Sequence, residues 1–98
     1  GNYENGFRSG KWLIYYITGQ KFQERSFING FNDGKYISWY DDAKIREEGE
    51  YFKGMITGHW RSFYEDGEPR SHILYDQHGN VEIYEMWLED GTKVEYGY

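Results

Sequence analysis

Three histidines are the residues of this 98-residue chain best suited to metal or acid–base chemistry. His59, His72 and His78 show none of the HxxxH or HExxH spacings that place two imidazoles on one metal ion. The chain has no cysteine, so no thiolate can complete a ligand set. A zinc site would need the histidines to meet in space through folding. We therefore interpret them as solvated turn or strand residues.

Carboxylates are the second group with chemical capacity, and they gather at Glu47–Glu50 and Glu65–Glu68. A pair that faced each other across strands could act as acid and base on a glycosidic bond. Their recurrence at predicted strand ends and turns favours a solvated acidic surface, so we expect no enzyme activity. Aspartates also precede several glycines without forming an Asp-x-Asp-x-Asp-Gly calcium loop. Asx-type turn stabilisation explains them more simply, and we predict no metal and no cofactor.

The charge balance limits the classes of partner. The sequence has 17 acidic and 11 basic residues, a formal net charge of −6. Nucleic acids and anionic membrane surfaces are bound through clusters of Lys and Arg, so we expect neither as a partner. A basic protein fits this charge better. No run approaches the roughly 20 apolar residues that span a bilayer, and we expect a cytoplasmic protein.

A unit of 24 residues recurs along the chain, which is the signature of a repeat architecture. Three copies begin with a glycine, a Lys or His and a ring: Gly10-Lys11-Trp12, Gly34-Lys35-Tyr36 and Gly58-His59-Trp60. Residues 3–6 match the tail of an earlier unit, so the array is entered in the middle of a repeat. We expect one array over residues 1–98, with units at 10–33, 34–57 and 58–81 and partial units at 1–9 and 82–98.

Each unit is predicted to be a β-hairpin. Thirteen glycines and an aromatic content of 21% favour strands joined by tight turns, because rings fit a pleated surface and glycine supplies positive φ. We expect first strands at Trp12–Tyr16, Ile37–Tyr40 and Arg61–Tyr64. Second strands are expected at Lys21–Phe27, Lys44–Phe52, Arg70–Tyr75 and Thr92–Tyr96, after turn residues Gly19, Ala43, Gly67 and Gly91. The fold class is all-β, with tandem antiparallel hairpins in an extended, twisted open sheet.

Alternation of side chains along strands predicts rows of rings at the 24-residue step. One face carries the candidate partner-binding row: Tyr15, Trp39, Phe63 and Trp87. The other carries two rows: Trp12, Tyr36, Trp60 and Tyr84, then Tyr16, Tyr40, Tyr64 and Leu88. We expect the rings of a row to stack along the array. The candidate row has two interpretations, rings that stabilise the sheet and rings that also form a ligand or peptide groove.

The motif formed by these residues resembles the MORN repeat, in its bacterial variant. The copy that matches best runs from Gly34 to Tyr51, with the Gly-Lys-Tyr opening, the pair Trp39-Tyr40, an acidic turn and a Glu-rich strand. The resemblance covers nearly the whole chain and departs in the last unit, where Glu82 replaces the opening glycine. It implies a hairpin sheet that serves as a protein–protein scaffold, as in YwqK-type antitoxin-like proteins. The phospholipid association of some MORN proteins is not carried over, because this chain is acidic.

We therefore expect a non-enzymatic, protein-binding repeat scaffold, an antitoxin-like component that presents an aromatic and acidic surface to a basic protein. Two alternatives stay open. The chain could be a self-associating structural segment that pairs through the free backbone groups of its edge strands. It could also be a carbohydrate-binding module, since aromatic rings stack on sugars.

Overall fold

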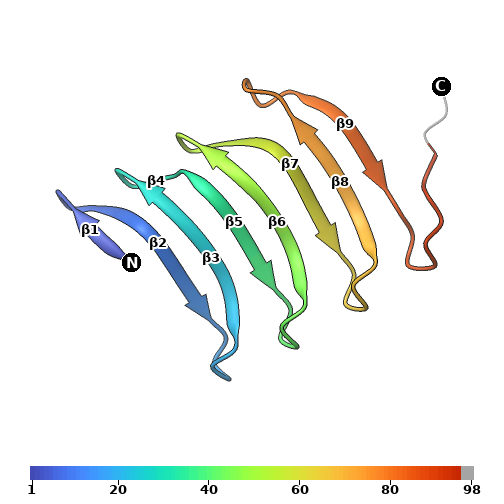
Figure 1. The fold of residues 1–98 in the computed structure, drawn as a ribbon, viewed down its shortest axis with the longest axis horizontal. Helices are drawn as coiled ribbons and strands as arrows, with labels where there is room; N and C mark the ends of the chain where they lie inside the picture. Colours follow the sequence, from blue (N-terminus) through green and yellow to red (C-terminus); the bar gives the residue numbers. More distant parts are fainter. Residues whose placement is uncertain (96–98) are drawn as a thin grey trace.

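A computed structural model describes residues 1–95, and all regular structure within them is β-strand (Figure 1). The strands are β1 (Asn2–Glu4), β2 (Phe7–Tyr15), β3 (Lys21–Ile28), β4 (Phe31–Asn32), β5 (Gly34–Trp39), β6 (Ile45–Phe52), β7 (Met55–Phe63), β8 (Pro69–Tyr75) and β9 (Val81–Met86). They form one antiparallel sheet in the order β1-β2-β3-β5-β6-β7-β8-β9, and short β4 pairs with β3. The predicted all-β class, with consecutive hairpins in an open sheet, is confirmed.

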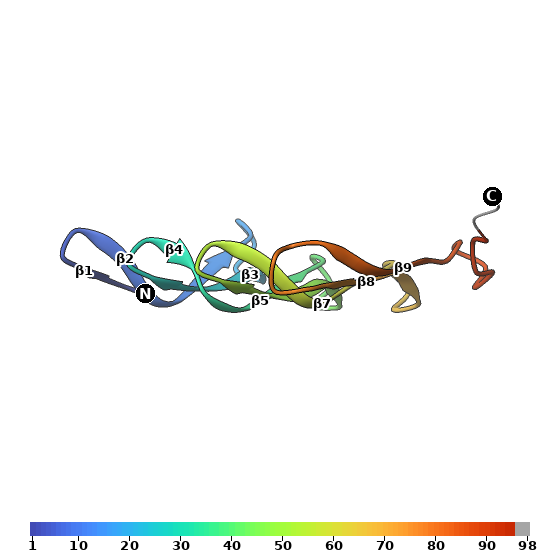
Figure 2. The same cartoon turned by 90° about the horizontal axis from the view of Figure 1, so that it is seen from above.

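The sheet is a single layer. Its extents are 50 × 37 × 12 Å, and seen edge-on in Figure 2 it has no second layer on either face. The buried side chains of the described residues are Phe27, Tyr36, Ser38 and Trp60, with exposures of 0 to 7%. Packing must therefore come from contacts between neighbouring strands of the same sheet.

Two kinds of turn alternate along the array. At one edge, two-residue turns such as Asn29-Gly30 have positive φ at both positions, 50° and 83°, as hairpins of this length require. At the other edge the turn residues Gly19, Ala43, Gly67 and Gly91 all adopt positive φ, between 73° and 92°, as predicted. Asp42 accepts a hydrogen bond from the backbone nitrogen of Lys44. Asp66 and Asp90 accept equivalent bonds two residues on, which confirms the Asx-type turns.

Two predictions of strand boundaries are wrong. First strands begin earlier than expected: β2 starts at Phe7, five residues before Trp12, and β7 starts at Met55, six residues before Arg61. Strand pairing resumes directly after the glycine of each two-residue turn. The prediction started these strands near the aromatic residues and so placed their beginnings too late. The expected second strand at Thr92–Tyr96 is reduced to one bridge between Trp87 and Lys93, and its last residue lies outside the described residues.

A bulge between β6 and β7 lays an indole over a glycine. Glu48 pairs with Arg61 and Glu50 with Thr57, so Gly49 alone faces three residues of β7. Gly58, with φ of 71°, permits this detour. The Trp60 ring then lies against the Gly49 backbone so closely that a Cβ at that position would overlap it.

The Trp60 indole is also the centre of an aromatic cluster with Tyr36 and Tyr51. Its Nε1 donates to the backbone oxygens of Glu50 and Thr57, each at 3.1 Å. Its ring stacks on Tyr36, with centroids 5.5 Å apart, and meets Tyr51 edge-on at 5.1 Å. The Tyr36–Trp60 pair stacks as predicted for this row, whereas Trp12 meets Phe27 edge-on with centroids 6.3 Å apart. Burial in the cluster raises the pKa of the Tyr51 phenol above its ordinary value.

One repeat earlier, Arg25 stands where Gly49 stands and Tyr36 where Trp60 stands. There the Arg25 guanidinium lies 4.7 Å from the centroid of the Tyr36 ring, in the geometry of a cation–π contact. The smaller phenol thus accommodates a side chain that the indole excludes. Ring size is matched to the residue beneath it.

Tyrosines of the third row join consecutive repeats by hydrogen bonds. The phenols of Tyr16, Tyr40 and Tyr64 donate to the backbone oxygens of Trp39, Phe63 and Trp87, at 3.0, 2.7 and 2.7 Å respectively. We expected this row to stack, and that prediction is wrong, because each phenol reaches toward the next repeat's backbone. Leu88, the fourth member, has no hydroxyl to donate.

We predict that Gly49→Ala destabilises the protein by about 1–3 kcal/mol, the range for an overpacked site. The added methyl meets the Trp60 indole, while the φ of Gly49 lies outside the positive region that disfavours alanine. Urea unfolding measures the loss. In a Trp60→Tyr background, which copies the arrangement at Tyr36, Gly49→Ala should cost less. Equal costs in the two backgrounds would contradict the steric explanation.

We predict that Tyr64→Phe lowers the free energy of unfolding by about 1 kcal/mol, because it deletes one hydrogen bond between repeats. Tyr15→Phe is the matched control, since the Tyr15 phenol makes no hydrogen bond in the structure and its side chain is 52% exposed. Thermal or urea unfolding of both variants decides the point. Similar losses in the two would show that the phenol of Tyr64 does not join the repeats.

Candidate functional site

The predicted partner-binding residues lie on one face of the sheet, here called the ring face. Tyr15, Trp39 and Phe63 are the last residues of β2, β5 and β7, and Trp87 directly follows β9. Strand alternation places these four rings opposite the face that carries Tyr36 and Trp60. The shared face and the shared row are therefore as the sequence predicted.

The rings of this row do not touch one another, so the expected stacking is wrong here. Each is paired with a residue of the intervening strand: Tyr15 with Lys21, Trp39 with Ile45 and Phe63 with Pro69. Two strand spacings separate the backbone positions of neighbouring members of the row by about 9.5 Å. The side chain of an intervening residue can contact a ring of the row. The Lys21 ammonium, for example, lies 5.5 Å from the centroid of the Trp39 ring. The row is a set of separate rings.

The row is only partly covered. Tyr15 is exposed, and the other three rings are half-buried. Phe63 and Trp87 line a common hollow of about 270 Å³, together with Arg61 and His72. Two rings and two nitrogen-rich side chains thus meet at the β7–β8–β9 end of the ring face.

A chain of polar contacts crosses this end of the ring face. His59 Nδ1 lies 2.8 Å from His72 Nε2, His72 Nδ1 lies 3.0 Å from Glu85 Oε1, and Lys93 Nζ donates to Glu85 Oε2 at 2.8 Å. These four residues are here called the histidine chain. Neighbouring-strand register produces it, since His72 pairs with both Arg61 and Glu85. The sequence predicted solvated turn or strand histidines. His59 is an exposed strand residue, as predicted, whereas His72 is half-buried and bonded to Glu85.

The hydrogen bonds of the histidine chain assign its protons. Glu85 is acceptor-only when ionised, so His72 Nδ1 carries the hydrogen that it shares with Glu85. When the His72 ring is neutral, its Nε2 is the acceptor and His59 Nδ1–H donates to it. General-base chemistry at His72 is blocked in this arrangement, because His59 occupies the nitrogen that a substrate would need.

Electrostatics at the histidine chain centre on Glu85. Hydrogen bonds from Lys93 and His72 hold the pKa of the Glu85 carboxyl below its ordinary value, and Glu85 in turn raises the pKa of Lys93. Along the described residues no group of three or more His, Cys, Asp or Glu side chains is placed to hold a metal ion.

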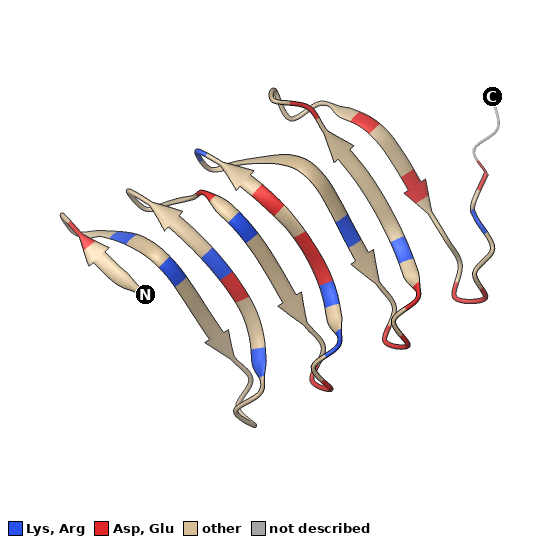
Figure 3. Ribbon diagram, in the orientation of Figure 1, with Lys and Arg blue, Asp and Glu red and all other residues tan. Residues whose placement is uncertain are grey.

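Figure 3 shows charges of both signs along the strands, with acidic residues gathered at the turns that follow the ring row.

These acidic turns border a second hollow, of about 600 Å³. Glu65, Asp66 and Glu89 line it with Tyr40 and Tyr64, and Arg70 is the basic residue among them. The predicted acidic surface at turns is therefore adjacent to the ends of the ring row. The turns directly follow the ring residues in the chain, whereas Tyr40 and Tyr64, which line the hollow, alternate to the face opposite the ring row.

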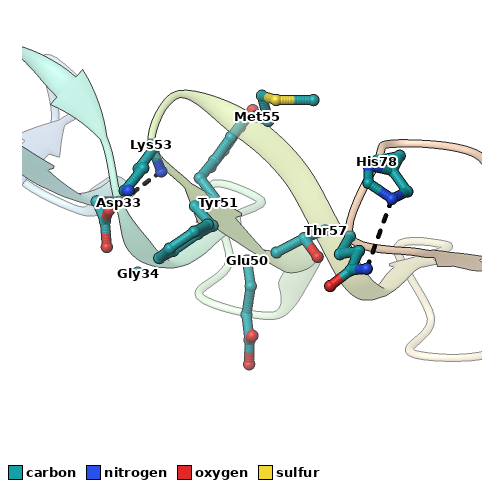
Figure 4. A pocket seen from close by; sticks show the side chains of 10 residues that line it. Asp33, Gly34, Glu50, Tyr51, Lys53, Met55, Thr57 and His78 are labelled. Carbon is teal, nitrogen blue, oxygen red and sulfur yellow. Dashed lines mark hydrogen bonds between the residues drawn. The ribbon is translucent and has the colours of Figure 1, made fainter.

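A third surface was missed by the sequence analysis. At the opposite edge, beside the two-residue turns, Ile28, Phe31, Phe52 and Met55 are all more than half exposed. They border two adjoining hollows of about 460 and 650 Å³. Figure 4 shows the larger one, where Lys53 N donates to Asp33 Oδ2 at 3.1 Å. The signal was present, since Phe7, Phe31 and Met55 follow successive turns at the 24-residue step.

Comparison with known protein families, with curated proteins and with solved structures finds no match for this chain. The described part of the chain contains no apolar helix of the length that crossing a membrane requires.

We predict that the stabilisation from Glu85 disappears in acid. Its folded pKa is lowered from the ordinary 4.5, so its contribution is complete above 4.5 and is lost as the pH falls through the lowered folded pKa. Urea unfolding of the wild type and of Glu85→Gln should differ most near neutral pH and converge once the pH lies below that lowered pKa. Glu82→Gln is the control, because Glu82 has no hydrogen bond or ion pair in the structure. A Glu85→Gln difference that persists at low pH would contradict the assignment.

Proposed function

We propose that this chain is a non-enzymatic, protein-binding scaffold made of MORN-like hairpin repeats, and that it acts as an antitoxin-like component. The binding surface is the ring face together with the acidic turns beside it. One observation carries this proposal: separate, partly exposed rings recur at a constant spacing along a single-layer sheet, next to clustered carboxylates.

The ring row has the composition of an interface anchor. Aromatic side chains are enriched at the energetically important centres of protein interfaces, and they lose little conformational entropy on binding. Trp39, Phe63 and Trp87 are half-buried in the free protein. Their orientation is thus set by the sheet before a partner arrives. Pre-organisation of this kind lowers the entropic cost of association.

The charge beside the row favours a basic protein as the partner. Seven carboxylates occupy the turns next to the rings: Asp41, Asp42, Glu65, Asp66, Glu68, Glu89 and Asp90. Opposite charges steer association and fix orientation, and like charges exclude wrong partners. By the same argument, nucleic acid and anionic membrane surfaces are poor partners. A cytoplasmic location remains a prediction.

Self-association is the second candidate, and the sheet edge favours it. Among the described residues β1 pairs with β2 alone, and no strand lies along the other backbone edge of Asn2–Glu4, where a further strand can pair. Sedimentation velocity over a wide concentration range distinguishes the two candidates. A chain that stays monomeric throughout removes self-association.

We predict that a phage-displayed peptide library selected on the immobilised chain enriches peptides rich in Lys and Arg. Their affinity should fall at least tenfold, about 1.4 kcal/mol, in the double variant Trp39→Ala/Phe63→Ala. It should also fall with added salt, because the carboxylates supply the steering. Biolayer interferometry measures both effects.

The matched control is Phe31→Ala/Phe52→Ala, which removes two exposed rings, 62% and 57% accessible, from the opposite edge. Circular dichroism checks that every variant keeps its strands. The proposal is wrong if the enriched peptides carry no excess of basic residues, or if both double variants lose affinity equally.

A further inference from the structure

The two histidines of the histidine chain meet edge to edge. Their ring planes differ by 14° and the centroids are 5.1 Å apart, while the nearest nitrogens are separated by 2.8 Å. Rings stacked face to face keep their atoms about 3.5 Å or more apart. The short N–N distance therefore requires nearly coplanar rings whose nitrogens point at each other. A tilt of the rings away from this head-on arrangement would direct the lone pairs of His59 Nδ1 and His72 Nε2 at one point.

The strands position this pair, and the outer ring is free to adjust. His72 lies in the middle of β8, between Arg61 of β7 and Glu85 of β9. His59 lies in the bulge of β7, where it pairs with Leu74 and its side chain is exposed. One imidazole is thus fixed by its neighbours on both sides. The other can move by a fraction of an ångström without disturbing the sheet.

Glu85 gives His72 the protonation state of a metal ligand. Metal-bound histidines usually donate their other ring N–H to a carboxylate, which fixes the tautomer and raises ligand basicity. The His72 Nδ1–Glu85 contact at 3.0 Å has this form, and Lys93 holds the second carboxylate oxygen. In the neutral ring, His72 Nε2 is therefore unprotonated, and it is directed at His59.

We propose that His59 and His72 bind one divalent transition-metal ion of the Zn²⁺, Ni²⁺ or Cu²⁺ class, through Nδ1 and Nε2 respectively. Imidazole nitrogens bind Zn²⁺ at about 2.0–2.1 Å, so a tetrahedral ion holds two of them about 3.3 Å apart. The pair must open by about half an ångström from its hydrogen-bonded distance, and the rings must tilt so that both lone pairs meet at the ion. The proton leaves His59 Nδ1, and the ring takes the tautomer protonated at Nε2.

Water completes the coordination, because the site supplies two protein ligands. On the His59 side it borders a hollow of about 300 Å³, lined also by Glu48 and Glu50, which leaves room for bound water. Lys35 and Arg61 also line this hollow, and Lys93 is already paired with Glu85. Affinity should follow the usual order for nitrogen ligands, with Cu²⁺ above Ni²⁺ and Zn²⁺.

Isothermal titration of the untagged chain with NiCl₂ and with ZnCl₂ tests the site. We expect one ion per chain, and at least tenfold weaker binding in His59→Ala and in His72→Ala. His78→Ala is the matched control: this third histidine sits in the turn after β8, next to Gln77, and its loss should leave the affinity within twofold. Circular dichroism verifies the fold of each variant.

Two further readouts separate coordination from a merely structural role. In NMR spectra with Zn²⁺, the ring nitrogens of His59 and His72 should shift while those of His78 stay in place. Glu85→Gln keeps both imidazoles and should weaken binding about tenfold, the usual effect of losing an outer carboxylate. Unchanged affinity in this variant would overturn the positioning role of Glu85. The site itself is refuted by the absence of saturable binding up to about 1 mM metal, or by equal affinity in His59→Ala and the wild type.

Discussion

The structure depends on the contact between an aromatic ring and the backbone of the preceding strand. A single-layer sheet has no opposing layer against which to bury side chains, so its packing must lie within its own plane. Trp60 supplies this packing by lying over Gly49 and between Tyr36 and Tyr51. The bulge at Gly58 makes the contact possible, because three residues of β7 there face one residue of β6. Stability is consequently local to neighbouring repeats, as in other repeat architectures.

The two faces of the sheet differ in how far their side chains are buried. The face with Tyr36 and Trp60 contains all four buried side chains of the described residues, the other two being Phe27 and Ser38. The ring face is less covered and carries Trp39, Phe63 and Trp87 as separate, half-buried rings. A slip of one residue in strand pairing would exchange the two faces. The tyrosine hydrogen bonds between repeats, such as Tyr64 to the Trp87 backbone, oppose such a slip.

The two proposed activities of the ring face adjoin each other. The hollow between Phe63 and Trp87 includes His72 in its lining, and His72 is the inner member of the histidine pair. A protein docked on the rings would therefore lie beside the proposed metal site. Both depend on the same register across β7, β8 and β9. The scaffold proposal rests on the whole ring row, whereas the metal proposal rests on two imidazoles and one carboxylate.

The sequence by itself determined the hairpins, the turn residues and the face of each ring. Those features are local, since a 24-residue period, positive φ at Gly67 and side-chain alternation follow from short-range geometry. Tertiary structure alone decided which side chains are in contact and where strand pairing begins. Intervening residues such as Pro69 separate the rings of the candidate row, and the start of β7 lies at Met55 because pairing resumes directly after the turn. The meeting of His59 with His72 depends on pairing across β7 and β8. Histidine spacing along the chain carries no information about that pairing, because it is set by contacts between strands.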